Sequence, residues 1–166
     1  MQFIRLAEKM QQKYILIKKP VLDSLCKKRY PLGRQSTRAL CEATFGTREV
    51  LDMAILVSGG AGYIGSHTCI ELLNAGYDVV VADNYYNASP VVLDRVKQIT
   101  GKDFRFYQAD MTKHEDVEKI FAECPDITAV IQFAAYKAVG ESVSKPIEYY
   151  YNNLNCTLVI LDVMRH

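Results

Sequence analysis

From residue 53 onward, short apolar runs alternate with longer segments of helical periodicity. The apolar runs, with one alternating stretch among them, are residues 54–57, 79–82, 104–109 and 129–135. Apolar positions at helical spacing mark residues 66–75, 91–99 and 115–123 and a long segment from residue 144 onward. Apolar strands separated by helices predict an α/β fold, with a parallel sheet and helices on both of its faces.

A glycine-rich turn joins the first strand to the first helix. Gly59, Gly62 and Gly65 have the spacing G-x-x-G-x-x-G, and Asp83 ends the second strand. Gly59 permits a tight turn, Gly62 lets a pyrophosphate approach the backbone, and Gly65 lets the helix lie close to the sheet. Asp83 can accept hydrogen bonds from both hydroxyls of an adenine ribose and would repel a 2′-phosphate, which favours NAD over NADP. The unit predicts a Rossmann-type dinucleotide site; the alternative is an ordinary turn with a solvated aspartate.

The sequence of this turn is similar to that of a known family. Residues 57–67, VSGGAGYIGSH, resemble the opening of the extended short-chain dehydrogenase/reductases, and most closely the UDP-glucose 4-epimerase family. A nucleotide-sugar 4,6-dehydratase shares the glycine turn, but residues 137–142, KAVGES, favour the epimerases. The resemblance covers residues 53–166 and implies the N-terminal part of an NAD-binding Rossmann domain, hence a truncated sheet. It implies interconversion of UDP-glucose and UDP-galactose in galactose metabolism, by transient NAD-dependent oxidation at sugar C4.

The resemblance also implies which residues bind the cofactor. They are Gly59, Gly62, Tyr63, Ile64, Gly65, Asp83, Asn84, Tyr85, Tyr86, Asn87, Ala88, Asp110, Met111, Phe133, Ala134, Ala135, Tyr136, Lys137 and Asn152. Asp110 would accept a hydrogen bond from the adenine amino group; alternatively it caps the next helix, for which Thr112 is the better candidate. Lys137 would place a positive charge near phosphate or ribose oxygens, or it is a solvated loop lysine.

Two positions depart from the family pattern. Gln132 stands where the family usually has His, and Ala135 stands where it usually has Gly. The methyl group of Ala135 could crowd a cofactor that approaches the backbone closely. We therefore expect a reduced cofactor affinity rather than a loss of binding.

The resemblance places the catalytic Tyr-x-x-x-Lys pair beyond residue 166. No tyrosine within residues 53–166 precedes a lysine by four positions, and Tyr14 and Lys18 lie before the first strand. We expect the NAD-binding half of an epimerase without catalytic residues; the alternative is a non-catalytic NAD-binding module or a defunct fragment. A UDP-sugar would bind only with the remaining part of the enzyme present. Complete family members are often homodimers.

The first 52 residues differ from the rest in charge. They hold 11 Lys and Arg against 5 Asp and Glu, whereas residues 53–166 hold 9 against 14. Five acids and two prolines argue against a transit peptide, and the basic residues form no dense run of the kind that binds nucleic acid. A partner contact is a further alternative. We expect this extension to be poorly ordered and without function. A further interpretation is translated leader sequence before an ancestral start at Met53.

Other features narrow the class of protein. The five cysteines are widely spaced, which indicates reduced thiols in a cytoplasmic protein and neither a metal site nor a disulfide framework. No apolar run reaches membrane-spanning length. The strand order 3-2-1-4 would leave the fourth strand as an exposed apolar edge. In the long helix we expect Tyr149, Tyr150 and Tyr151 to serve mainly in packing, and a buried face made by Leu154, Leu158, Leu161, Val163 and Met164.

Overall fold

The computed structural model describes residues 15–17 and 54–166. Its strands are β1 (Ile15–Ile17), β2 (Ala54–Ser58), β3 (Asp78–Asp83), β4 (Arg105–Gln108) and β5 (Ile127–Gln132). Its helices are α3 (Tyr63–Asn74), α4 (Val91–Thr100), α5 (His114–Glu123), α6 (Val139–Ser144) and α7 (Pro146–Arg165). The alternation expected from the sequence is confirmed, with α6 as an additional short helix.

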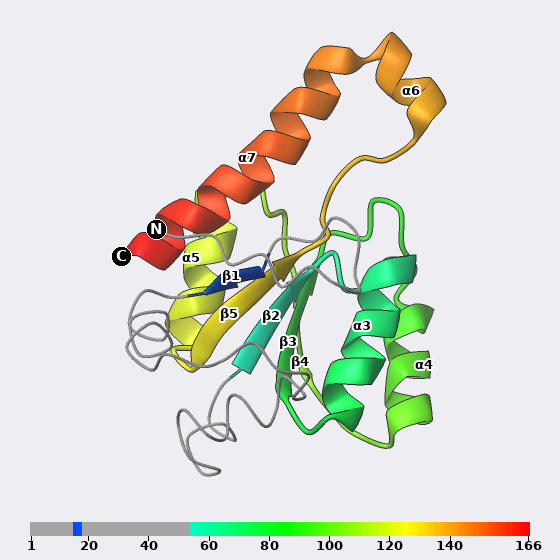
Figure 1. The fold of residues 1–166 in the computed structure, drawn as a ribbon, viewed down its shortest axis with the longest axis vertical. Helices are drawn as coiled ribbons and strands as arrows, with labels where there is room; N and C mark the ends of the chain where they lie inside the picture. Colours follow the sequence, from blue (N-terminus) through cyan, green and yellow to red (C-terminus); the bar gives the residue numbers. More distant parts are fainter. Residues whose placement is uncertain (1–14, 18–53) are drawn as a thin grey trace, which may run out of the picture.

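The strands form one sheet in the order β1-β5-β2-β3-β4. The pairs β5–β2, β2–β3 and β3–β4 are parallel, which confirms the predicted order 3-2-1-4. Because all four parallel strands point the same way, their carboxyl ends meet at one edge of the sheet (Figure 1). That edge is where open α/β sheets bind ligands.

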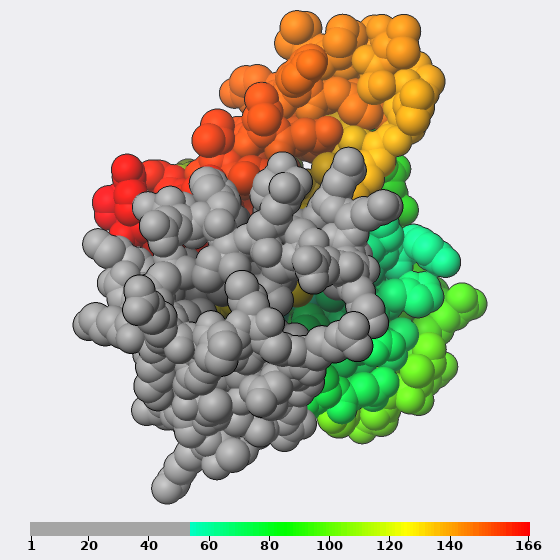
Figure 2. All heavy atoms as spheres, in the orientation of Figure 1, coloured from blue at the N-terminus to red at the C-terminus, as the bar shows by residue number. Residues whose placement is uncertain are grey.

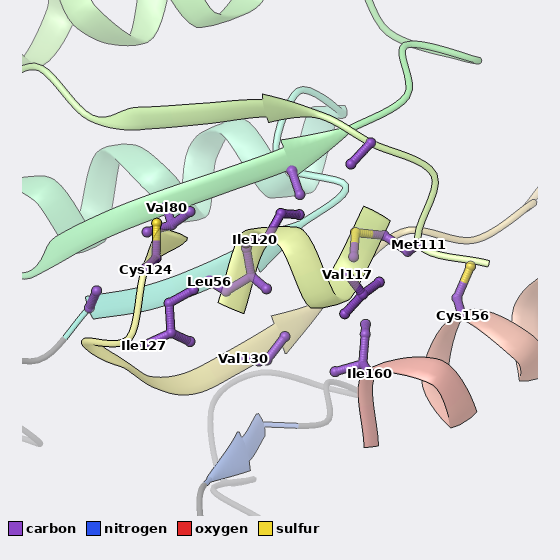
Figure 3. Close-up of a cluster of buried hydrophobic side chains, with 13 residues drawn as sticks. Leu56, Val80, Met111, Val117, Ile120, Cys124, Ile127, Val130, Cys156 and Ile160 are labelled. Carbon is purple, nitrogen blue, oxygen red and sulfur yellow. The ribbon is translucent and has the colours of Figure 1, made fainter. Parts of the chain in front are cut away.

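Helices cover both faces of the sheet, with α3 and α4 on one face and α5 and α7 on the other (Figure 1). Alternate residues of each strand point to opposite faces, so Leu56 and Val57 of β2 belong to different cores. Figure 3 shows the core under α5 and α7, where Ile120 and Ile160 pack near Leu56 and Val130. The sheet is therefore held between two apolar layers.

Two helices end beside a glycine whose φ lies in the left-handed region. Gly76 follows α3 with a φ of 87°, and Gly101 caps α4 with a φ of 63°. The prediction that Thr112 caps α5 is wrong, because the N-cap residue is Lys113 and no side chain caps the helix. The hydroxyl of Thr112 donates instead to Asp110 Oδ1 at 2.7 Å.

Helix α7 is only partly buried. Tyr149, Cys156 and Ile160 are its buried residues. Leu154 and Leu158 were expected in the buried face, but 58% and 61% of their surface is exposed, and Tyr150 and Tyr151 are exposed as well. Together with α6, the first turns of α7 project from the rest of the described residues (Figure 2).

The edge of β5 is occupied rather than exposed. Strand β1 pairs with it antiparallel, with Ile15 opposite Ile131 and Ile17 opposite Ala129 (Figure 1). The expectation of an open fourth strand is therefore wrong along residues 129–131. The rest of the first 52 residues, and the predictions made for them, lie outside the described residues.

The described residues contain no helix that combines the length and the apolar character needed to cross a bilayer. Within the same residues, no three His, Cys, Asp or Glu side chains gather in a group that could hold a metal ion.

Candidate cofactor site

An open cleft lies at the carboxyl ends of the parallel strands, and the space in it, counted together with the solvent at its mouth, is about 590 Å³. Its lining consists of Gly59, Gly62, Asp83, Asn84, Tyr86, Asn87, Ala88, Ala109, Asp110, Met111, Phe133, Ala134, Ala135, Tyr136, Asn152 and Cys156. Four separate loops and α7 thus contribute to one site.

The glycine turn is closed by backbone contacts that leave no room for side chains. Gly59 has a φ of 72°, and a Cβ there would lie 2.6 Å from the amide nitrogen of Ala134. A Cβ on Gly65 would collide with the carbonyl oxygen of Gly59 and lie 2.7 Å from Gly60 Cα. The role expected from the sequence for Gly59 in the turn is thereby confirmed, and Gly65 lets the start of α3 lie close against the turn itself.

The amino end of α3 is open toward a ligand. Gly62 is its N-cap residue, no side chain caps the helix, and its first turn holds no acidic residue. The unpaired N–H groups and the positive end of the helix dipole favour an anion. A Cβ on Gly62 would meet only the Gly59 carbonyl, at 3.3 Å, so the absence of a side chain keeps this part of the cleft free.

Asp83 is a buried carboxylate at the end of β3, with 8% of its surface exposed. Its Oδ2 accepts from the amide of Ala61 in the glycine turn at 3.0 Å, and its Oδ1 accepts from the amide of Tyr85 at 2.9 Å. These bonds fix the carboxylate between the turn and the loop after β3. Each oxygen retains a further lone pair, so the group can also accept from ligand hydroxyls.

The loop after β3 turns one tyrosine inward and one toward the cleft. Tyr85 has a φ of 59°, and its ring packs 5.2 Å from that of Phe106, outside the cleft lining. Burial, and then the charges of Asp83 and Asp94, raise the pKa of the Tyr85 hydroxyl. Asn84 accepts from the amide of Tyr86 at 3.0 Å, a local turn that holds the remainder of the loop at the cleft.

Asp110 lies in the cleft beyond the end of β4. Its Oδ1 accepts both the amide and the hydroxyl of Thr112, and its own amide donates to Asp116 at 2.9 Å. Asp110 therefore closes a turn before α5 and is not the N-cap residue of that helix. Both bonds to its carboxylate end on Oδ1, which leaves Oδ2 available for a ligand.

The loop after β5 is tied to α7. Asn153 bonds both backbone groups of Tyr136. The Tyr136 ring is in contact with the rings of Tyr86 and Tyr149, with centroids 4.9 Å and 5.4 Å away. Tyr149 donates to Glu141 at 2.8 Å, so α6 is held against α7. Its bonds with Tyr149 and then with Lys145 lower the pKa of the Glu141 carboxyl.

The cleft brings together 14 of the 19 residues that the sequence suggested for the cofactor. Outside its lining lie Tyr63, Ile64, Gly65, Tyr85 and Lys137. The sequence analysis missed Ala109, which precedes Asp110, and Cys156, which follows Asn152 by one helical turn. Burial, and then the charge of Asp110, raise the pKa of the Cys156 thiol to about 11, so this thiol is protonated and acts as an apolar wall.

Gln132, at the position where the family usually has His, supports the loop rather than the cleft. Its Nε2 donates to the carbonyl of Ala134 at 3.0 Å. Its Oε1 and the hydroxyl of Ser58, its register neighbour, are buried without a partner among the described residues.

Comparisons with known proteins agree with this geometry. Residues 55–166 match the NAD dependent epimerase/dehydratase family. The UDP-glucose 4-epimerase of Bacillus subtilis (strain 168) is 60% identical over 112 residues, which are 68% of this chain and 33% of that protein. The enzyme of the same name from Drosophila melanogaster is 51% identical over 116 residues, again 33% of its length. The chain thus spans about a third of the length of the curated relatives it matches.

Solved structures show the same similarity. The UDP-glucose 4-epimerase of Bifidobacterium longum, in complex with NAD+ and UDP, superimposes with a TM-score of 0.65 at 57% identity. That of Stenotrophomonas maltophila, with bound NAD and formylated UDP-arabinopyranose, has a TM-score of 0.65 at 41% identity. Each comparison covers 68% of this chain and 33% of the other.

Proposed function

Because the chain belongs to the NAD dependent epimerase/dehydratase family, we propose that its cleft binds NAD as the cofactor part of a UDP-glucose 4-epimerase. The observation that carries the proposal is the buried carboxylate of Asp83, held by two backbone amides beside an uncapped helix N-terminus. A fixed acceptor for ribose hydroxyls next to an anion site is the arrangement that a dinucleotide requires.

Each part of NAD has a matching part of the cleft. Asp83 accepts the hydroxyls of the adenine ribose, and Asp110 with Met111 receives the adenine. The glycine turn and the start of α3, including Tyr63 and Ile64, receive the pyrophosphate. The loop after β5 receives the nicotinamide ribose, and Lys137 on that loop supplies a positive charge near it. When bound, NAD accepts a hydride and returns it.

The activity proposed for the complete protein is the interconversion of UDP-glucose and UDP-galactose. In that activity NAD would take up the hydride of sugar C4 and give it back to the opposite face, so the sugar would not be oxidised overall. Support comes from relatives of that name at up to 60% identity. We include a cytoplasmic location and a UDP-sugar substrate in this proposal. The second candidate is a non-catalytic NAD-binding module.

Calorimetric titration of the full 166-residue chain with NAD tests the proposal. We expect binding that Asp83→Ala weakens by about 1.5–3 kcal/mol, on the order of 10- to 100-fold, because charge-assisted hydrogen bonds are lost. Asp94→Ala is the matched control, since Asp94 is exposed on α4 and does not line the cleft. No binding by a folded chain, or equal affinities for all three proteins, would refute the assignment of the cleft.

An activity assay separates the two candidate functions. The 166-residue chain is incubated with NAD and UDP-galactose, and the formation of UDP-glucose is followed. Binding of NAD without turnover supports the cofactor module, and the epimerase proposal then concerns a longer protein that carries the catalytic pair. Turnover by the chain alone would require another base and would overturn the role given to that pair.

We further infer that the protein self-associates through α7. Ile147, Tyr151, Leu154 and Leu158 are all exposed, and their spacing of four, three and four residues places them on one face of the helix. Apolar residues at this spacing form the seam of packed helix pairs. A contiguous exposed stripe of this kind is typical of a protein interface.

A further inference from the structure

Strand β1 lies where a complete doubly wound sheet has its next parallel strand. The order β4-β3-β2-β5 corresponds to the first four strands of such a sheet, in which the fifth strand pairs beside the fourth. That place beside β5 is taken here by Ile15–Ile17, and the pairing is antiparallel. We propose that Ile15–Ile17 is an intramolecular edge strand that protects β5 from pairing with the β5 strand of a second copy of this chain.

Strand β5 has the properties of a strand that pairs readily with a further strand at its edge. Ile127 and Val130 of β5 are fully buried and Ile131 is nearly so, and β2 pairs with the other side of the strand. Among the described strands only β1 pairs with this side of β5, so without it the backbone N–H and C=O groups along residues 129–131 would form an open edge of that sheet beside an apolar core. Such an edge is a template for strands of other molecules.

The sequence of β1 suits a strand that ends a sheet. It has three residues, and in the sequence Lys13 precedes it while Lys18, Lys19 and Pro20 follow it. Very short strands, lysine and proline are the features by which natural proteins prevent a sheet from growing at its edge. β1 therefore closes the edge of β5 without offering another edge of the same quality.

The direction of β1 identifies the competing occupant. Its pairing shows that the β5 edge accepts an antiparallel strand. Two copies related by a twofold axis would present their β5 strands to each other antiparallel, with the same surface on both sides. Release of β1 would therefore permit a continuous sheet across two molecules.

Substitutions in the full chain test this role. The variant Ile15→Pro/Leu16→Pro/Ile17→Pro removes all three N–H donors of β1, and Ile15→Val/Leu16→Val/Ile17→Val is the control that keeps them. Sedimentation velocity is recorded for each, with and without a peptide of residues 12–20. We expect the proline variant alone to form larger species than the wild type at equal concentration, and the peptide to restore the wild-type distribution. A folded proline variant with the wild-type distribution would overturn the proposal.

If the proline variant fails to fold, hydrogen exchange on the wild-type chain tests whether β1 covers the edge of β5. The amides of residues 129–131 that face β1 should exchange about tenfold or more slowly compared with unprotected amides, as hydrogen-bonded strand amides do. Exchange of those amides at the unprotected rate would show that β1 does not cover the edge. NAD binding is measured separately, so failure of this proposal is distinct from failure of the cofactor assignment.

Discussion

Asn153 on α7 bonds both backbone groups of Tyr136 in the loop that follows β5. Its Oδ1 accepts from the Tyr136 amide at 2.7 Å, and its Nδ2 donates to the Tyr136 carbonyl at 3.0 Å. The Asn153 side chain thus pairs with both the N–H and the C=O group of Tyr136, as a neighbouring strand would in a sheet. These two bonds hold the Tyr136 ring beside Tyr86 at the cleft. Asn153 does not line the cleft itself and acts as a positioning residue.

Asn153→Ala should loosen the loop after β5 and weaken NAD binding. Both backbone groups of Tyr136 lose their partner, which costs about 1–3 kcal/mol where no water replaces it. We expect a lower free energy of unfolding in urea and an NAD affinity reduced by up to about tenfold. Thr157→Val is the control on the same helix, because the Thr157 hydroxyl bonds only within α7, to the carbonyl of Asn153. Unchanged NAD affinity in Asn153→Ala would show that the two Asn153–Tyr136 hydrogen bonds do not position the loop after β5 for the cofactor.

Ala135→Gly should raise the affinity for NAD. Ala135 lines the cleft at a position where the related epimerases usually have glycine, and its methyl group occupies space beside the backbone. Calorimetry should give tighter binding, while the free energy of unfolding falls by about 0.5–1 kcal/mol because glycine gains freedom in the unfolded chain. Ala138→Gly, outside the cleft lining, is the control and should leave the NAD affinity unchanged. Equal or weaker NAD binding by Ala135→Gly would show that the methyl group does not crowd the cofactor.

Replacing three glycines by alanine, one at a time, should distinguish two causes of lost stability: backbone strain at a positive φ and steric overlap of the added Cβ. Gly101→Ala meets no atom within 4 Å but retains a positive φ of 63°, so about 1–2 kcal/mol of stability is lost. Gly59→Ala adds to a similar strain a contact of 2.6 Å with the Ala134 amide nitrogen and should lose several kcal/mol and NAD binding together. Gly140→Ala, within α6 and in open space, should be neutral or stabilising. Urea unfolding of all three checks the order; a Gly59→Ala variant no less stable than Gly101→Ala would contradict the collision.

The sequence was sufficient for the parallel sheet and most of the cleft, because both depend on local signals. The glycine turn, the apolar strands and the acids at the ends of β3 and β4 each follow from neighbours in the chain. Asn153 could not be found in that way, since its partner Tyr136 lies 17 residues away and the contact exists only after α7 has folded back. Tyr85 points away from the cleft because its left-handed φ turns the ring toward Phe106.

The exposed face of α7 and the strand β1 escaped prediction for a related reason. Helical spacing shows that Leu154 and Leu158 share a face with Ile147, but it does not show whether a neighbour covers that face. The three residues of β1 have no periodicity to distinguish them from a coil segment. Their place in the sheet depends on the edge of β5, more than one hundred residues further along the chain.

Charges on the exposed face of α7 should prevent self-association. Leu154→Lys/Leu158→Lys places two ammonium groups in the proposed interface. The free-energy cost of burying these charges would exceed the stabilisation from the helix contact. Sedimentation equilibrium should show a dimer for the wild type and a monomer for the variant, with the helical content unchanged. Ile99→Lys is the matched control, since Ile99 is exposed to a similar degree but lies on α4. A monomeric wild type, or a variant that still dimerises, would exclude this helix as the interface.

His114 should link the end of α7 to the start of α5 in a manner that depends on pH. Its Nε2 lies 3.2 Å from Asp162 Oδ2 and its Nδ1 lies 3.4 Å from Glu118 Oε2, and the bond to Asp162 is the main cause that raises the pKa of His114 above 6.5. Because the folded pKa exceeds the unfolded one, the contact contributes fully below about pH 6.5 and is lost as the pH rises through the folded pKa. NMR titration of the imidazole should show the raised pKa, and Asp162→Asn should lower it more than Glu118→Gln does. The stability difference between wild type and Asp162→Asn should shrink as the pH rises above 6.5; a difference that stays constant with pH would refute the link.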